Sequence, residues 1–158
     1  MPQDSTATAE KEVQKANEEK WSKTLMAAGW TAIPSVILEK QHALGLDAID
    51  MNIIAHLTIY WWKRANLPRP SVATIAKAVG VKPRTIQKHL KKMEDDGFIT
   101  RHQRRRTGQS NNTNLYSFDG LIKAVTPFAQ EKIDAMAQRQ QQEAQRVARK
   151  KPTLAVVK

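Results

Sequence analysis

Hydrophobic residues recur every three or four positions along most of the chain, which predicts a mainly helical fold. Residues 9–28 form a predicted N-terminal helical extension whose apolar residues are spaced i, i+4 and i+7: Trp21, Leu25 and Ala28. Gly29 ends this extension, and the small, polar residues 1–8 before it are expected to be disordered. The first half of the extension has one sizeable apolar residue, Val13, so it is either a solvated helix or an arm that becomes ordered on a partner.

Two core helices are predicted before residue 63. The first starts at Pro34, a residue suited to the first helical position, ends at Gly45, and contributes three core residues: Val36, Ile37 and Leu38. The second starts after Asp47, a favourable N-cap residue. The negative charge of Asp50 in its first turn interacts favourably with the positive end of the helix dipole. Its apolar stripe has apolar flanks, which predicts burial on more than one side: Ile49, Ile53, Leu57 and Tyr60 or Trp61. The two tryptophans at its end are expected to anchor the core or a subunit interface rather than stack on bases: Trp61 and Trp62.

Residues 71–95 predict two helices joined by a tight turn. Ser71 caps the first helix, and Gly80 supplies the left-handed turn that a Cβ would resist. The first helix turns small or apolar residues inward: Ile75, Ala76 and Val79. The second helix begins at Pro83 and places three apolar residues on its inward face: Ile86, Leu90 and Met93.

A basic β-hairpin follows the second helix. GFITRHQRRR predicts one strand, TGQSNNTN the tip and LYSF the returning strand. The two-residue period places Tyr116 and Phe118 on the face that covers the core, beside Phe98 and Ile99. Helix, turn, helix and basic hairpin in this order are typical of a winged helix-turn-helix, which lays its second helix in the major groove of duplex DNA.

The positive charge of the chain is concentrated on this unit. Net charge is +11, and residues 61–106 hold 13 Lys and Arg against three acidic residues, whereas the rest of the chain holds 13 against 12. A merely basic, soluble protein spreads its charge over the surface, and a nucleic-acid-binding surface concentrates it. The distribution therefore favours DNA contacts within the predicted helix-turn-helix and hairpin.

Three groups of residues are predicted to contact DNA. The recognition helix carries side chains that can bond base edges or phosphates: Lys82, Pro83, Arg84, Thr85, Gln87, Lys88 and Lys91. The wing is expected to hold phosphates and one minor groove: Arg101, Arg104, Arg105, Arg106, Ser110, Asn111 and Asn112. Two residues at the start of the first helix are expected to meet the DNA backbone: Ser71 and Thr74. His89 and His102 are further candidates for DNA contact, and His56 is expected in or near the core.

The stretch from Gly29 to about Ala129 resembles the helix-turn-helix family found in plasmid and phage replication initiators and small mobile-element regulators. The matching motifs are GWTAIPSVIL, the helix that ends in YWW, PSVATIAKAVGVKPRTIQKHLKKMEDDGFI and NTNLYSFDGLI. The resemblance implies a winged helix-turn-helix DNA-binding domain over residues 29–126. The family commonly has Ser where Lys82 stands, which weakens the expected cap of the recognition helix but not the helix itself.

Residues 127–158 predict a C-terminal helix and a basic tail. Asp119 caps a short helical turn, GLIKAV, and Thr126 and Pro127 open a separate helix. That helix has a coiled-coil-like seam that becomes polar: Ala129, Ile133, Met136, Gln140, Glu143 and Val147. Three interpretations are open, namely a packed helix over residues 128–136 with a frayed tail, a dimerisation helix, and a basic arm on DNA. The first is favoured, and it leaves room for part of the helix to serve a dimer.

No catalytic pattern is found in the sequence. The chain has no Cys, and it has no phosphate-binding loop, HExxH or GxSxG motif. Tyr60 and Tyr116 are both predicted in the core, so neither is expected to nick DNA. We expect no catalytic residue, metal, cofactor or small-molecule ligand. No apolar run approaches the roughly 18 residues of a membrane span, and the polar start MPQDSTATAEKE does not resemble a signal peptide, which favours a cytoplasmic, nucleoid-associated protein.

The predicted fold is mainly α with a small β-hairpin, a winged helix-turn-helix with N- and C-terminal helical extensions. The predicted function is sequence-specific binding of double-stranded DNA by a small transcriptional regulator, a repressor or autorepressor that acts as a homodimer on an inverted repeat. The alternative is a plasmid or phage replication-initiation or partition protein that binds repeated sites. A general binder of RNA or other nucleic acid is a third class.

Overall fold

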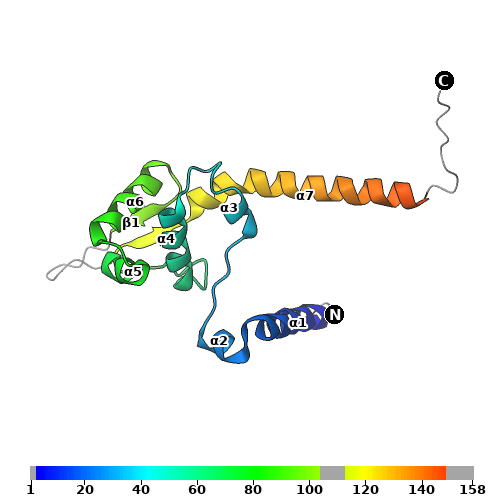
Figure 1. The fold of residues 1–158 in the computed structure, drawn as a ribbon, viewed down its shortest axis with the longest axis horizontal. Helices are drawn as coiled ribbons and strands as arrows, with labels where there is room; N and C mark the ends of the chain where they lie inside the picture. The colour runs from blue at the N-terminus through cyan, green and yellow to red at the C-terminus, as the bar shows by residue number, and fades with distance from the viewer. Residues whose placement is uncertain (1–2, 104–112, 149–158) are drawn as a thin grey trace, which may run out of the picture.

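Helices dominate the structure, and the hairpin forms its small sheet (Figure 1). A computed structural model describes residues 3–103 and 113–148 of the chain. In chain order the elements are α1 (Gln3–Trp21), α2 (Lys23–Ala28), α3 (Ser35–Glu39), α4 (Ala48–Ile59), α5 (Val72–Val79), α6 (Pro83–Asp95), β1 (Thr100–His102), β2 (Leu115–Ser117) and α7 (Asp119–Ala148). The predicted fold class, mainly α with a small β-hairpin, is confirmed.

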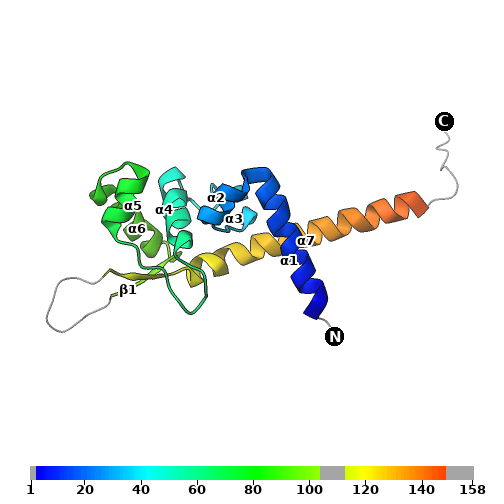
Figure 2. The same cartoon turned by 90° about the horizontal axis from the view of Figure 1, so that it is seen from below.

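The elements divide into a packed body and two projecting parts. Helices α3 to α6, the hairpin and the first turns of α7 form the body (Figures 1 and 2). Figure 1 shows α1 and α2 apart from it at the end of an extended segment. Helix α7 continues well beyond the body in both views.

Apolar residues from every element of the body form one core. Most of the predicted inward residues of α4, α5 and α6 are buried: Ile53, Leu57, Ile75, Ala76, Ile86, Leu90 and Met93. Ile49 and Val79, also predicted inward, are half-buried and pack against the core. Those of α3 and the hairpin are buried as well: Val36, Ile37, Ile99, Tyr116 and Phe118. Leu38 was expected in the core, but it is 52% exposed because the five-residue α3 buries one face and Leu38 lies on another. Tyr60 is 48% exposed because α4 ends at Ile59, before the helical period reaches it.

Helix α4 begins with the predicted capping arrangement. The Asp47 carboxylate accepts hydrogen bonds from the backbone N–H groups of Ile49 and Asp50, each at 2.9 Å. The Asp50 carboxylate in turn accepts from the backbone N–H of Asp47 at 3.0 Å, which completes a capping box. This reciprocal pair fixes the start of the helix on which the recognition helix packs.

Helices α5 and α6 and the turn between them match the sequence prediction closely. Ser71 caps α5 by accepting a hydrogen bond from the backbone N–H of Thr74 at 3.0 Å, and Gly80 ends it with φ 79°. Pro83 occupies the first turn of α6, and Lys82 provides no side-chain cap. Because Ala76 is small and 2% exposed, the two helices of the motif can pack closely.

The hairpin is a short antiparallel pair, with Arg101 opposite Tyr116. The backbone N–H of Tyr116 also donates to the carbonyl oxygen of Pro68 at 3.0 Å, so the segment before α5 lies along the free edge of β2. This edge contact and the α5–turn–α6 unit complete a winged helix-turn-helix fold. Residues 107–112 of the predicted wing tip lie outside the described residues.

Helix α7 corrects the prediction of two separate helices. It runs without interruption from Asp119 to Ala148 with Pro127 inside it, so the boundary predicted at residues 126 and 127 falls within one helix. An interior proline removes one helical hydrogen bond and usually kinks or breaks the helix. The Thr126 hydroxyl donates to the Ile122 carbonyl at 2.7 Å, and Phe128, directly after the proline, packs against the core.

The packed part of α7 is shorter than predicted. Phe128 and Ala129 contact the core, but Ile133 and Met136 are 58% and 59% exposed. The interpretation of a packed helix over residues 128–136 therefore holds only for its start, because α7 leaves the body there (Figure 1). The Lys132 ammonium still reaches Glu39 of α3 at 2.6 Å.

The N-terminal extension consists of two helices rather than one. Helix α1 begins at Gln3, so most of the segment 1–8 that was expected to be disordered is helical, and no Pro or Gly interrupts the chain between it and Gly29. Ser22 separates α1 from α2 with a positive φ of 83°, and its hydroxyl caps α2 at the backbone N–H of Leu25, 3.3 Å away.

No helix in the described ranges is long and apolar enough to cross a membrane.

Candidate nucleic-acid interface

The recognition helix α6 has one buried side and one exposed side. Ile86, Leu90 and Met93 are at most 1% exposed. Seven predicted DNA-contacting residues lie at its start or on its outer surface, where Thr85 is half-buried and the others are exposed: Lys82, Pro83, Arg84, Thr85, Gln87, Lys88 and Lys91. The separation into two sides follows from the 3.6-residue period, and it leaves the polar side free to enter a groove.

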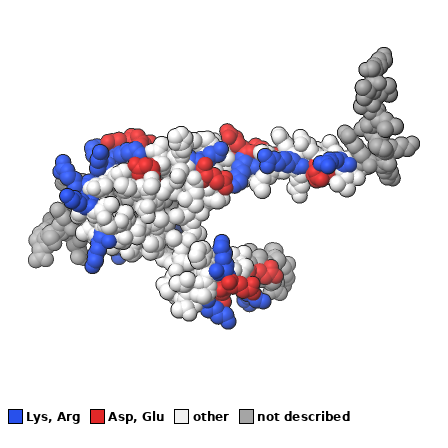
Figure 3. Space-filling view, in the orientation of Figure 1, with Lys and Arg blue, Asp and Glu red and all other residues white. Residues whose placement is uncertain are grey.

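The cations of α6 differ in what they contact. Lys91 forms an exposed ion pair with Asp95 at 2.9 Å, one helical turn further along. Arg84 and Lys88, nearer the N-terminus, have no ion-pair partner among the residues that the structure describes. Lys and Arg side chains gather at the end of the body that holds α5, α6 and the hairpin, whereas acidic side chains lie towards the end of α6 (Figure 3). The uncompensated charge is therefore at the start of the helix.

A buried carboxylate lies behind the recognition helix. The side chain of Asp50 is fully buried, with Oδ1 2.8 Å from Nδ1 of His89 and Oδ2 2.6 Å from Nζ of Lys92. Lys92 also donates to the carbonyl of Gly45 at 2.8 Å, and Asp47 Oδ2 lies 3.5 Å from His89 Nδ1. His89 was a candidate for DNA contact, but its ring is directed into this network. His56 is half-buried, as expected, and His102 is exposed.

The charges of this network stabilise one another. Burial raises the pKa of Asp50, but hydrogen bonds from Lys92, the Asp47 backbone and His89 outweigh it, so the pKa is lowered overall. The hydrogen bond to Asp50 raises the pKa of Lys92. Asp47, Asp50 and His89 each bring one potential metal-ligand atom within 4.8 Å of the others, but Lys92 already supplies a cation at the Asp50 carboxylate. These side chains therefore form an ion network in which Lys92 supplies the positive charge.

Arg101, predicted as a DNA contact of the wing, is bound within the protein. Its guanidinium donates from Nε to Glu94 Oε2 at 2.8 Å, and a second guanidinium nitrogen contacts the same oxygen. The hydrogen bond that Arg101 donates to Glu94 lowers the pKa of Glu94 and raises the pKa of Arg101. This pair joins the end of α6 to the base of the hairpin.

We expect the double variant Glu94→Gln/Arg101→Gln to bind DNA within about twofold of the wild type, because it keeps the net charge and removes no free cation. The loss of a half-buried ion pair should lower the free energy of unfolding by about 1 kcal/mol. Fluorescence anisotropy over a salt series measures the first effect and urea unfolding the second. A salt slope reduced by about 0.9 would show instead that Arg101 contacts a phosphate.

The other predicted DNA contacts either bond to one another or lie outside the described residues. The Ser71 hydroxyl lies 2.8 Å from that of Thr74, which is exposed at the start of α5. The remaining wing residues lie outside the described ranges: Arg104, Arg105, Arg106, Ser110, Asn111 and Asn112. Their roles stay predictions from the sequence.

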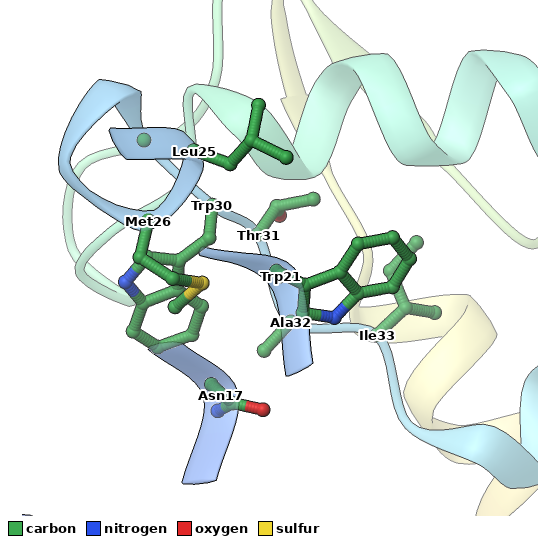
Figure 4. A pocket seen from close by; sticks show the side chains of 9 residues that line it. Asn17, Trp21, Leu25, Met26, Trp30, Thr31, Ala32 and Ile33 are labelled. Atoms are coloured by element: carbon green, nitrogen blue, oxygen red, sulfur yellow. The ribbon is translucent and has the colours of Figure 1, made fainter. Parts of the chain in front are cut away.

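A second surface was not anticipated as a unit. Trp61 packs on Phe118 with ring centroids 5.4 Å apart, as expected of a core anchor, whereas Trp62 is 66% exposed and meets Trp30 edge to face at 6.1 Å. Nearby, an open hollow of about 530 Å³ lies between α1, α2 and the segment that follows (Figure 4). Nine residues line it: Asn17, Trp21, Leu25, Met26, Gly29, Trp30, Thr31, Ala32 and Ile33. None of them belongs to the motif or hairpin. The sequence signal for this surface was the apolar spacing of the N-terminal extension, because Trp21 and Leu25 of that spacing line the hollow.

Comparisons with known proteins agree with this geometry. Residues 44–99 match a family model described as a helix-turn-helix domain, and they span α4, α5 and α6. The crystal structure of the N-terminal domain of DnaD protein from Geobacillus kaustophilus HTA426 is similar in fold, with a TM-score of 0.53 and 16% sequence identity. That likeness covers 75% of this chain and 96% of the other. A comparison with curated protein sequences finds no match. The helix-turn-helix domain indicates that the protein binds DNA.

Proposed function

We propose that this protein is a sequence-specific binder of double-stranded DNA that acts as a small transcriptional regulator, a repressor or autorepressor of its own promoter. The observation that carries the proposal is the division of α6, whose apolar side is buried while Arg84 and Lys88 are exposed beside Gln87. Arg can bond guanine through two hydrogen bonds, and Gln can do so with adenine. In this proposal the wing residues hold the DNA backbone, and regulation follows from occupancy of the site.

The proposed role is binding without catalysis, metal or cofactor. The titratable groups around α6 support it because they are engaged with one another: Asp50 with His89 and Lys92, and Glu94 with Arg101. A catalytic group needs instead to reach a substrate with a proton or electron pair. We infer a protein that acts on DNA by occupying it.

A replication-initiation or partition role is the second candidate. Helix α7 favours it, because the helix carries exposed apolar side chains at Ile133, Met136 and Val147 beyond the body. A protein that recruits others to DNA needs a surface of this kind away from the DNA-binding end. The two roles share the same DNA contacts and differ in the arrangement of their sites.

Footprinting on genomic fragments at physiological salt tests the proposal. A homodimeric regulator should protect one inverted repeat near its own promoter, with half-sites about one helical turn apart, and light scattering should give the mass of a dimer. An array of direct repeats would favour the initiation or partition role. The absence of any discrete protected site would contradict both.

A further inference from the structure

The buried Asp50 carboxylate holds the recognition helix at two points. It contacts His89 Nδ1 at 2.8 Å through one oxygen and Lys92 Nζ at 2.6 Å through the other. His89 and Lys92 lie three residues apart, about one helical turn, on the flank of α6 between its buried stripe and the exposed side that carries Lys88 and Lys91. The two contacts therefore restrain both the rotation of α6 about its axis and its position along that axis.

We propose that Asp50 is a positioning residue for DNA reading, which fixes the direction in which the exposed side of α6 faces the DNA. This inference rests on the proposed function, because it concerns discrimination between DNA sequences. Asp50 belongs to α4 and has no exposed side chain, so it acts on DNA only through the helix that it holds.

Directional contacts supply what apolar packing lacks. Ile86, Leu90 and Met93 hold α6 on the core by burial, which has no preferred direction and tolerates small rotations. Hydrogen bonds weaken steeply as their angles deviate, so a small rotation of α6 would lose the contacts to Asp50 before it exposed the apolar side. Lys82 provides no side-chain cap at the start of the helix. The Asp50 network is therefore the directional restraint behind the middle of α6.

The network is itself anchored to the start of α4. The backbone N–H of Asp47 donates to Asp50, and the carbonyl of Gly45 accepts from Lys92. Replacing a buried ion pair with apolar residues is often neutral or stabilising, so stability alone does not account for an arrangement of this kind. Its particular contribution is geometry, and a useful base contact requires the reading side chains to be held within about half an ångström.

The test compares Asp50→Asn with Asp134→Asn, an equal charge change at an exposed residue on the projecting part of α7. Anisotropy measures Kd for two duplexes of equal length, the tightest one selected from a random library and a scrambled version. In Asp50→Asn the ratio of the two Kd values should fall at least about tenfold, while Kd for the scrambled duplex stays within about threefold. Asp134→Asn should keep the wild-type ratio. A wild-type ratio in folded Asp50→Asn overturns the proposal.

A second variant separates positioning from stability. Asp50→Leu/Lys92→Met replaces the ion pair by apolar side chains and should unfold at a higher temperature than Asp50→Asn. A low ratio of the two Kd values in this stable double variant supports the positioning role, and a wild-type ratio overturns it. This second measurement decides the question even if Asp50→Asn does not fold. Failure of the wild type to discriminate between the two duplexes would contradict the proposed function instead.

Discussion

Replacing Gly120 with Ala is expected to lower the free energy of unfolding by at least about 3 kcal/mol. Gly120 is the second residue of α7, where this helix begins against the turn that follows α6. A Cβ on Gly120 would overlap the carbonyl oxygen of Gly97, and it would lie 2.9 Å from the carbonyl carbon of Gly97 and 3.2 Å from the carbonyl oxygen of Phe98. These are backbone atoms, so no side-chain rotation relieves the overlap.

The close approach at Gly120 is held by a hydrogen bond. The backbone N–H of Leu121 donates to the carbonyl of Phe98 at 2.8 Å, and the side chain of Leu121 is 2% exposed. Moving α7 away would therefore break this bond and open the core. Without the overlap, Ala would stabilise a helix by up to about 1 kcal/mol relative to Gly, so a large loss can only come from the clash.

Gly80→Ala is the matched control for Gly120→Ala. Gly80 has φ +79°, but nothing lies within 4 Å of an added Cβ. The control should therefore lose only the about 1–2 kcal/mol that an L-residue costs in the left-handed region. Urea unfolding followed by circular dichroism measures both variants. Equal losses in the two would show that α7 can move away from Gly97 at little cost.

Replacing Arg84 with Ala is expected to weaken binding to the selected duplex by about 1–3 kcal/mol, roughly five- to 150-fold, and Lys88→Ala should act in the same direction. The reason is that both cations are exposed on the free side of α6 and have no ion-pair partner in the described part of the chain. Binding to a scrambled duplex should fall much less, because only a base contact distinguishes sequences.

Arg139→Ala is the control for Arg84→Ala. Arg139 is an exposed cation on the part of α7 that projects from the body, so its loss removes the same charge away from α6. Its effect should be small and equal on both duplexes. If Arg84→Ala weakens both duplexes equally, then Arg84 contacts phosphates and does not read bases.

Local sequence signals predicted the helices of the motif well. Ser71, Gly80 and Pro83 specify the ends of α5 and α6 through a cap, a left-handed turn and a fixed φ, and each acts within a few residues. Periodicity placed Ile86 and Leu90 in the core because one stripe of α6 had to be apolar. Prediction was weaker at α7, where Pro127 indicated a helix boundary but the helix continues through it.

The sequence by itself determined the winged helix-turn-helix architecture, the bounds of its two helices and the concentration of positive charge within residues 61–106. Only the tertiary structure decided which charged groups are free and which are bound within the protein. In the sequence Asp50 is an ordinary acid at the start of a helix. In the structure it is buried and contacts His89 and Lys92, which lie 39 and 42 positions further along the chain. The sequence predicted Arg101 as a DNA contact of the wing, yet it forms an ion pair with Glu94. The physical reason is that charge and periodicity are properties of single residues and single helices, whereas burial and ion pairing depend on how α4, α6 and the hairpin come together.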